Sequence, residues 1–314
     1  MSQGKIKILD GSFGFQLNKH LEKPLDNDPL WSAKALVIDP EAVIKTHMDY
    51  IQVNVDIIET NTYQASIPGF KKYLNLSDEE SYKLIQEAVN LAKTAVQRCD
   101  NIGFKRPLIA GSIGPYGAYL HDGSEYNGHY TDFTTDDELR MYHKSRIEAL
   151  VRSGVDLLAI ETIPSKKEAL IILEIVKQYP EMKTWLSFSC KTDGVSTVHG
   201  DNFETTAVEC YNSNTDQIIA VGVNCIAPHA VEDLIKNINK GREQPIPLIV
   251  YANSGEKYNP EAGGWDDNRE RLENYIPTWL NLGVTYIGGC CRVCANYICK
   301  IREQVEKWEE KQSL

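Results

Sequence analysis

Residues 155–190 read VDLLAIETIPSKKEALIILEIVKQYPEMKTWLSFSC, and the order of patterns in this stretch decides the fold. The first run, VDLLAIET, is apolar almost throughout, as in strands that are covered on both faces of a parallel sheet. Ser165 then opens a segment of helical spacing that extends to Gln178. A second apolar run, WLSFSC, begins at Trp185. A strand, a helix and a strand in this order predict a parallel βαβ unit.

The same alternation continues in both directions along the chain. Eight short apolar runs are predicted as strands, at residues 5–12, 55–61, 107–114, 155–162, 185–190, 218–225, 247–254 and 284–290. Helix start signals stand between them, such as Asp39 before Pro40 and the capping box from Ser77 to Glu80. Strand-then-helix units repeated in this way predict an α/β fold, a single (β/α)8 TIM barrel that spans residues 1–314. A doubly wound open sheet is the alternative.

Composition and charge exclude several classes of protein. Of the 314 residues, 42% are hydrophobic and 25% charged, which excludes a disordered or coiled-coil chain. The formal net charge of −11 disfavours contact with nucleic acid or anionic lipid. No apolar run approaches the roughly 18 residues of a membrane helix, and the start of the chain lacks the apolar core of a signal peptide. We expect a cytoplasmic protein that binds neither nucleic acid nor membrane, and no obligate protein partner is evident.

Polar residues stand where the predicted strands end. Barrels of this kind carry their active sites at the carboxyl ends of the strands. Those ends are Asp10-Gly11-Ser12, Glu59-Thr60-Asn61, Ser112-Ile113-Gly114, Glu161-Thr162, Ser189-Cys190, Asn224-Cys225, Asn253-Ser254 and Gly289-Cys290-Cys291. Residues 116–135, rich in Tyr, Gly and His, are predicted as an irregular loop over a pocket at the same end of the barrel.

Three cysteines at two of these strand ends predict a metal site. Cys225 ends the sixth predicted strand, and Cys290 and Cys291 end the eighth. Neighbouring residues of a regular strand point to opposite faces, so both could reach one metal only where the strand stops. Three thiolate ligands with a fourth position open are typical of a catalytic zinc. A closed site that also uses Cys294, and a redox pair of Cys291 with Cys294, are the alternatives.

Two acidic residues are candidates for binding an amino acid. Asp10 and Glu161 end the first and fourth predicted strands, so both face the same mouth and could bind an ammonium group. Backbone N–H groups of the turn that begins with Gly11 and Ser12 could then bind a carboxylate. Asn224 is a further substrate-binding candidate. Alternatively, Asp10 only caps its turn and Glu161 pairs with a nearby Lys or Arg, or the two carboxyl groups hydrolyse a glycoside.

The strand-end motifs resemble those of the homocysteine S-methyltransferase family. They are DGSFG (10–14), ETNTY (59–63), GSIGPYG (111–117), ETIPS (161–165), GVNC (222–225) and GGCCR (288–292), in this order through essentially the whole chain. The resemblance implies a zinc-dependent enzyme that methylates L-homocysteine to methionine. It implies one Zn²⁺ per chain, with Cys225, Cys290 and Cys291 as its ligands. It also implies that Asp10 and Glu161 hold the homocysteine amino group.

The resemblance favours the short branch of the family, which uses S-methylmethionine or S-adenosylmethionine. The chain lacks the long C-terminal arm of the betaine enzyme, and Thr162 stands where that enzyme has an aromatic residue. Aromatic faces stabilise a sulfonium cation by cation–π contact. Trp31, Tyr63, Tyr116 and Tyr119 are therefore predicted to form the donor pocket. A betaine-dependent enzyme, or a non-catalytic barrel in which zinc only ties two strands together, is the alternative.

Overall fold

The predicted barrel is confirmed in a computed structural model, which describes residues 5–26, 28–256, 258–259, 264–266 and 268–313. Its strands are β1 (Lys7–Ile8), β2 (Ile57–Glu59), β3 (Leu108–Ile113), β4 (Leu157–Ile163), β5 (Thr184–Phe188), β6 (Ile218–Asn224), β7 (Leu248–Ala252) and β10 (Val284–Gly289). They form one eight-stranded sheet in the order β1-β10-β7-β6-β5-β4-β3-β2, and all pairs are parallel. A parallel bridge between Leu9 and Ile57 joins the first strand to the last in this order. The sheet therefore closes, which excludes the open doubly wound alternative.

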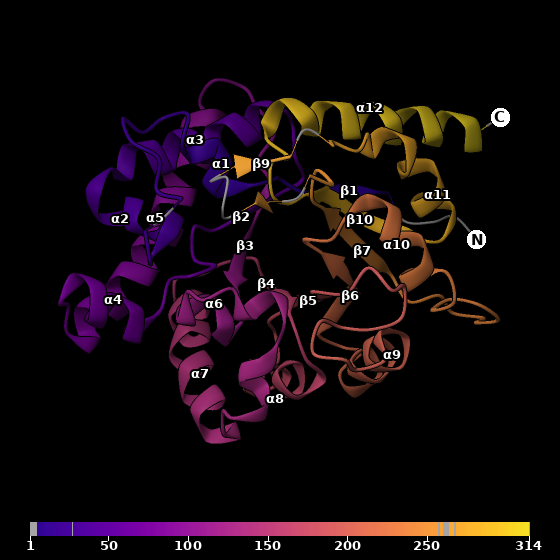
Figure 1. Cartoon of the computed structure of the whole chain (residues 1–314). Helices are drawn as coiled ribbons and strands as arrows, with labels where there is room; N and C mark the ends of the chain where they lie inside the picture. The colour runs from indigo at the N-terminus through magenta and orange to yellow at the C-terminus, as the bar shows by residue number, and fades with distance from the viewer. Residues whose placement is uncertain (1–4, 27, 257, 260–263, 267, 314) are drawn as a thin grey trace.

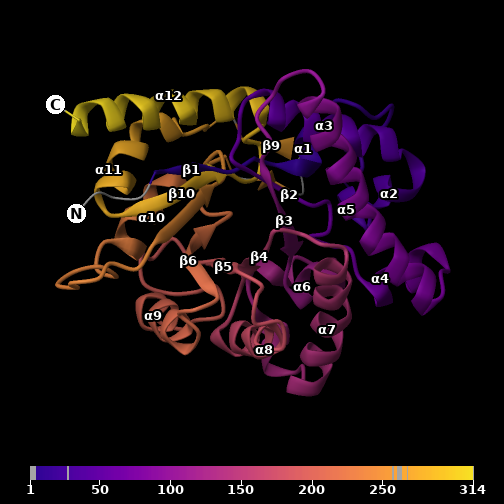
Figure 2. The same ribbon diagram turned by 180° about the vertical axis from the view of Figure 1, so that it is seen from behind.

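Helices surround the sheet (Figures 1 and 2). They are α1 (Phe13–Leu17), α2 (Ala35–Ile38), α3 (Pro40–Gln52), α4 (Ile67–Leu74), α5 (Asp78–Asp100), α6 (Tyr116–Leu120), α7 (Asp136–Arg152), α8 (Lys166–Val176), α9 (Phe203–Ser213), α10 (Pro228–Ile235), α11 (Ile276–Asn281) and α12 (Ala295–Gln312). Short 3-10 helices are η1 (Trp31–Lys34), η2 (Ser124–Tyr126), η3 (His129–Asp132) and η4 (Leu272–Asn274). No helix in the described part of the chain is long and apolar enough to span a membrane.

Several of the helices begin where a side chain accepts a hydrogen bond from a free backbone N–H group. The Asp39 carboxylate accepts from the Ala42 N–H at 3.0 Å, one residue before Pro40 at the start of α3. The predicted capping box is confirmed, because the Ser77 hydroxyl accepts from the Glu80 N–H at 3.2 Å and the Glu80 carboxylate accepts from the Ser77 N–H at 2.8 Å. Such caps are worth about 1 kcal/mol each and fix the first turn of each helix.

Two segments differ from the sequence-based expectation. Residues 116–135 were expected to be an irregular loop, but they contain α6, η2 and η3. The connection after β7 holds a small antiparallel hairpin of β8 (Tyr258–Asn259) and β9 (Gly264–Trp265), which was not expected. Very short helices and two-residue strands have no sequence period long enough to detect.

Large side chains fill the inside of the barrel below its mouth. Trp185 and Tyr251 pack there with Leu9, Ile57 and Leu157. A larger apolar layer lies between the outer face of the sheet and the helices. The barrel is therefore packed rather than hollow, and polar groups at the carboxyl ends of the strands rest on a rigid apolar floor.

Candidate active site and metal centre

Three cysteine sulfur atoms gather at the mouth of the barrel. Cys225 directly follows β6, and Cys290 and Cys291 directly follow β10, where the regular strand has ended at Gly289. All three sulfur atoms lie within 4.8 Å of one another, and those of Cys225 and Cys291 are 3.5 Å apart. Two sulfur ligands of a tetrahedral zinc, each at about 2.3 Å from the ion, are separated by about 3.8 Å. The three thiols therefore fit a soft divalent cation, and Cys294 is not in this group.

The thiols also have the electrostatics of a metal site. Hydrogen bonds with Cys225 and Cys291, followed by burial, raise the pKa of the Cys290 thiol well above its usual value. The same kind of bonds, donated by Cys225 and Cys290, lower the pKa of Cys291 well below its usual value. The three thiols are thus linked to one another through their hydrogen bonds. A divalent cation would stabilise all three thiolates instead, because metal ligation requires the deprotonated form.

Three carboxyl groups lie next to the sulfur atoms. Asp10 is only 3% exposed and Glu161 only 7% exposed, and Glu59 is half-buried at the end of β2. The Asp10 carboxylate accepts from the Glu59 N–H at 2.8 Å, and the Ser112 hydroxyl donates to Glu161. Burial raises the pKa of all three carboxyl groups, and their mutual repulsion raises those of Asp10 and Glu59 further. Asp10 therefore does tie two strand ends together, but it also faces the cavity.

The cavity that these groups line carries no basic side chain among its described lining residues. In particular, Glu161 forms no ion pair with a Lys or Arg among the described residues, which removes one of the alternatives considered for it. Buried carboxylates without a partner are costly, and a bound cation relieves that cost. Three acids and three thiols in one cavity therefore indicate a site for cationic groups.

Two buried residues of the cavity lining each have a polar atom that lacks a partner within the described part of the chain. These atoms are the hydroxyl of Ser12 and the side-chain carbonyl oxygen of Asn61. Buried polar atoms are nearly always hydrogen-bonded, so these two are free to bind a ligand. The Ser12 N–H, by contrast, donates to the Val293 carbonyl oxygen at 2.9 Å. It cannot also bind a carboxylate, which corrects the expectation that the whole turn after β1 presents free N–H groups.

Two of the four aromatic residues predicted for the donor pocket line this cavity. Trp31 and Tyr63 meet edge to face, with ring centroids 6.4 Å apart. Glycines make room for both rings. A Cβ at Gly14 would lie 2.4 Å from the Trp31 ring, and a Cβ at Gly114 would lie 2.5 Å from the Tyr63 carbonyl oxygen. The DGSFG and GSIGPYG motifs thus contain glycines because aromatic residues pack directly against their backbones.

The other two predicted aromatic residues do not reach the cavity. Tyr116 and Tyr119 pack against each other at 5.7 Å, and Tyr116 lies 5.0 Å from Tyr142 and 5.6 Å from Tyr130. Neither ring lines the cavity, so their expected place at the donor is corrected to packing beneath α6. Sequence reasoning placed them by their position in the loop, but α6 turns their side chains inward.

Asn224 does not line the cavity either. It is fully buried, and its amide is engaged by Thr162 and Ser187 at three contacts of 2.8 Å. The expected contact with substrate is therefore corrected to a contact within the protein. Thr162, which is one partner of this amide, has a φ value of +58°, and Cys225, which follows Asn224 in the chain, has a φ value of +53°. Left-handed backbone at non-glycine residues costs about 1–3 kcal/mol each and is common at functional sites.

A segment that we call the cover segment, residues 116–134, reaches over the sulfur atoms. Tyr126 lines the cavity, and its hydroxyl lies 3.9 Å from the Cys225 sulfur. Its neighbour Glu125 has a carboxylate oxygen without a partner among the described residues, and burial raises the pKa of Glu125 to about 7. The expectation that this part of the chain lies over a pocket is therefore confirmed, although its structure is helical.

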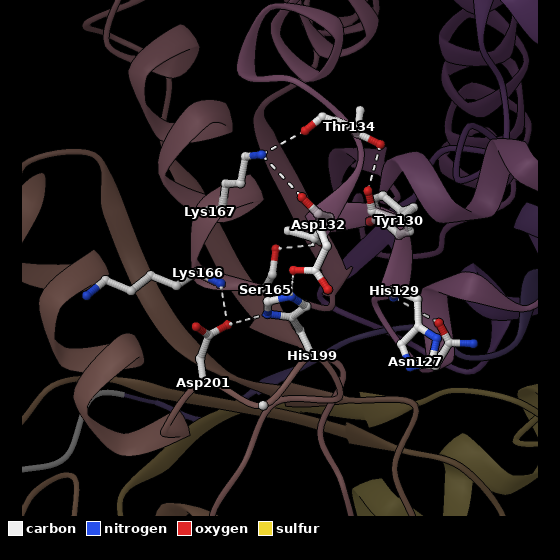
Figure 3. A network of polar contacts seen from close by, with 12 residues as sticks. Asn127, His129, Tyr130, Asp132, Thr134, Ser165, Lys166, Lys167, His199 and Asp201 are labelled. Carbon is white, nitrogen blue, oxygen red and sulfur yellow. Dashed lines mark hydrogen bonds and ion pairs between the residues drawn. The ribbon is translucent and has the colours of Figure 1, made fainter.

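The cover segment is anchored from its outer side (Figure 3). The His199 ring lies between two carboxylates, with Nε2 3.1 Å from Asp132 and Nδ1 3.6 Å from Asp201. Lys167 donates to the carbonyl oxygens of Thr134 at 2.7 Å and Thr131 at 3.2 Å. These contacts join the end of the cover segment to the start of α8 and to the loop after β5.

Comparisons with known proteins identify the family of this chain. Residues 7–305 match the homocysteine S-methyltransferase family. A betaine-homocysteine S-methyltransferase of Drosophila melanogaster is 42% identical over 313 residues, which cover 96% of this chain and 94% of that protein. Homocysteine S-methyltransferase 1 of Arabidopsis thaliana is 38% identical and covers 97% of this chain and 94% of that protein. The chain belongs to the homocysteine S-methyltransferase family.

A solved structure of another family member shares the fold. The homocysteine methyltransferase MmuM of Escherichia coli, in its metallated form, superposes with a TM-score of 0.83 at 32% identity and covers 96% of this chain and 97% of that one. The Drosophila relative has a bearing on the donor. Its name, betaine-homocysteine S-methyltransferase, includes betaine, and the match with this chain extends over 94% of its length. Chain length therefore does not separate the betaine branch from the sulfonium branch of the family.

Sequence reasoning missed several residues of the site. Glu59 and Ser112 were recognised as strand ends but received no role, and Tyr126 and Tyr251 were not considered, although all four line the cavity. The signal for Glu59 was present, because it ends β2 and Asp10 closely follows the end of β1. No signal could have found Tyr251, which looks like an ordinary aromatic residue within an apolar strand.

Proposed function

We propose that this protein transfers a methyl group from a sulfonium donor to the thiol of L-homocysteine, and that the reaction depends on zinc. Membership of the family supports homocysteine as the acceptor. One observation carries the proposal. Three cysteine sulfur atoms and three carboxyl groups line the same cavity, and the described lining of that cavity has no basic side chain. Such a cavity suits a thiol, an ammonium group and a second cation together.

Cys225, Cys290 and Cys291 would hold the zinc ion. Three thiolates on Zn²⁺ leave a net charge of about −1 and one position open, as in catalytic rather than structural zinc sites. When bound there, zinc would keep the sulfur of homocysteine ionised at neutral pH. A thiol with a pKa of about 8.5 is only about 3% ionised at pH 7, so ionisation alone gains roughly 30-fold, or about 2 kcal/mol.

Most of the acceleration must come from the way in which the protein positions the two substrates. Asp10 and Glu161 would bind the homocysteine ammonium by charge-assisted hydrogen bonds, and the free Ser12 hydroxyl would bind its carboxylate. The homocysteine thiol first loses its proton to solvent. Its sulfur then attacks the methyl carbon in line, and the bond from that carbon to the donor sulfur breaks. Correct alignment of two reactants can supply about 7–11 kcal/mol.

The charge of the cavity favours a sulfonium donor such as S-methylmethionine. That donor carries a sulfonium and an ammonium group, and S-adenosylmethionine carries the same pair. The faces of Trp31, Tyr63 and Tyr126 can stabilise the sulfonium by about 0.5–2 kcal/mol each. Betaine carries a single quaternary ammonium cation, whereas each sulfonium donor brings two cationic groups to the same acidic lining. The betaine-named relative makes betaine the second candidate.

A panel of donors tests the proposal. Protein loaded with zinc is mixed with L-homocysteine and, in separate reactions, with S-methylmethionine, S-adenosylmethionine or betaine, and methionine is measured. We expect methionine from S-methylmethionine at the highest kcat/KM, and loss of the activity when a chelator removes the zinc. Activity with betaine alone would overturn the choice of donor. If no donor gives methionine although about one zinc ion is bound per chain, the zinc has a structural role and the proposal is wrong.

A further inference from the structure

Asn224 joins the two ends of the proposed substrate site. It precedes Cys225 at the end of β6, and its amide bonds to Thr162, which follows Glu161 in β4. The Thr162 N–H donates to the Asn224 side-chain oxygen at 2.8 Å, and the Asn224 NH₂ group donates to the Thr162 hydroxyl at 2.8 Å. One side chain thus connects the strand of a proposed metal ligand to the strand of a proposed ammonium ligand.

The orientation of this amide is determined by its partners. The Ser187 hydroxyl also donates to the Asn224 side-chain oxygen, at 2.8 Å. A reversed amide would place its NH₂ group against the Thr162 N–H, so only one orientation satisfies all three groups. The Ser187 oxygen is itself 2.5 Å from the Tyr251 hydroxyl, to which the Trp185 indole N–H donates at 3.1 Å.

These contacts are buried and hold a strained backbone. Asn224, Ser187 and Trp185 are fully buried, and Tyr251 is 2% exposed. Buried hydrogen bonds of this kind are costly to break because each leaves a polar group without a partner. Thr162 and Cys225 both have positive φ, a conformation that a loose chain would abandon. The network thus keeps two unfavourable backbone conformations in place, one beside each end of the substrate site.

We propose that Asn224 is a positioning residue that fixes the separation of Cys225 from Glu161 and so selects homocysteine over cysteine. The inference rests on the proposed function, in which the substrate thiol lies at the cysteines and its ammonium group at Glu161. Homocysteine and cysteine carry the same groups but differ by one methylene between them. A rigid site bridges only one of these lengths well, and one methylene is worth about 10–200-fold in kcat/KM.

The test compares the two amino acids in Asn224→Ala and the unaltered protein, both loaded with zinc. We expect the ratio of kcat/KM for homocysteine to that for cysteine to fall at least about fivefold, from the 10–200-fold that one methylene provides. The ratio of the dissociation constant for cysteine to that for homocysteine, measured by calorimetry without a methyl donor, should fall in parallel. An equal loss for both amino acids, with the ratio unchanged, would overturn the proposal.

Asn239→Ala is the matched control. Asn239 also bridges with both ends of its amide, donating to the Ile246 carbonyl oxygen at 2.9 Å and accepting from the Ile246 N–H at 2.8 Å. It lies before β7, at the opposite end of the barrel from the cysteines. The variant should lose stability but keep the homocysteine-to-cysteine ratio. A similar fall of the ratio in this variant would mean that general loosening, and not the bridge, is responsible.

Two milder variants keep the proposal testable if Asn224→Ala does not fold. Ser187→Ala and Thr162→Val each remove one hydroxyl partner of the amide. Each should lower the ratio of the dissociation constant for cysteine to that for homocysteine at least about twofold. An unchanged ratio in both would overturn the proposal. Failure of the proposed function has a different signature, because the unaltered protein would then form no methionine and would show no preference for binding homocysteine.

Discussion

The sulfur atom of Cys225 lies 3.5 Å from that of Cys291, although the two residues follow different strands. This separation is far longer than the roughly 2.05 Å of a disulfide bond and close to the distance between two ligands of one tetrahedral zinc. The end of β10 at Gly289 brings Cys290 to the same point. The three sulfur atoms are therefore already grouped as the ligands of the proposed zinc ion would be, which would reduce the cost of assembling that site.

Removing one of these sulfur atoms should remove the metal. We expect Cys291→Ser to lower bound zinc from about one per chain to a small fraction after dialysis, because a serine hydroxyl stays protonated at neutral pH and is a poor zinc ligand. Metal content by mass spectrometry is the measurement. Cys294→Ser is the matched control and should keep its zinc. Zinc loss in the control would support the closed site with four cysteines instead.

The two glutamates of the cavity should respond differently to neutralisation. Burial raises the pKa of both carboxyl groups, but only Glu161 is proposed to bind the ammonium group of homocysteine. Glu161→Gln should raise the KM for homocysteine about 10–100-fold, the value of a hydrogen bond to a charged group. Glu59→Gln should change it less than about threefold, because Glu59 has no proposed contact with the substrate. Equal effects on steady-state KM would contradict this division.

Position along a strand could be read from the sequence, but side-chain direction could not. Cys225, Asp10 and Glu161 were found because parallel strands end at one rim, so that residues distant in sequence share a mouth. Asn224 ends a strand in the same way, yet its amide turns toward Thr162 inside the protein. Tyr116 turns inward with α6 for a similar reason. Such directions depend on partners from other strands, which a single segment of sequence does not specify.

His47 should destabilise the protein in acid. It is fully buried beside Phe13, with ring centroids 4.8 Å apart, and neither ring nitrogen has a partner in the described part of the structure. Burial lowers the pKa of His47 to about 3, compared with about 6.5 in the unfolded chain. The unfolded state therefore binds the extra proton, and stability falls as pH drops from about 6.5 towards 3.

Replacing this histidine should remove that part of the acid sensitivity. The full difference in pKa corresponds to at most about 5 kcal/mol. His47→Leu should therefore flatten the free energy of unfolding between pH 6.5 and 4, measured by urea titration at several pH values. His121→Leu is the control, because the side chain of His121 is exposed whereas that of His47 is fully buried. A pH profile that His47→Leu does not alter would mean that His47 is hydrated in the folded protein.

Release of the cover segment should weaken the site without unfolding the barrel. His199→Ala removes the contacts of the ring with Asp132 and Asp201, both of which are partly exposed, so we expect a loss of less than about 1 kcal/mol in stability. Tyr126 should then be held less firmly over the cavity. We expect faster proteolysis within residues 116–134 and a several-fold rise in the KM of the donor. Unchanged proteolysis would show that the contacts on the buried side of the cover segment are sufficient to hold it in place.

Arg146 should be one of the most sensitive positions for stability. It is 1% exposed, and its guanidinium donates to the carbonyl oxygens of Thr62, Tyr63, Ala65 and Gly114 at 2.8–3.1 Å. These carbonyls belong to the turns after β2 and β3, so the arginine holds the backbone that carries Tyr63 into the cavity.

Arg146→Met keeps the volume but removes all of these donors. Each buried carbonyl left unpaired costs about 1–3 kcal/mol, partly offset by the cost of burying the charge in the unaltered protein. We expect a net loss of about 3–5 kcal/mol in the free energy of unfolding, measured by urea titration. Arg140→Met is the control, because Arg140 forms an exposed ion pair with Glu174 whose loss should cost less than about 1 kcal/mol. A similarly small loss in Arg146→Met would mean that water can replace the guanidinium as the donor to these carbonyl groups.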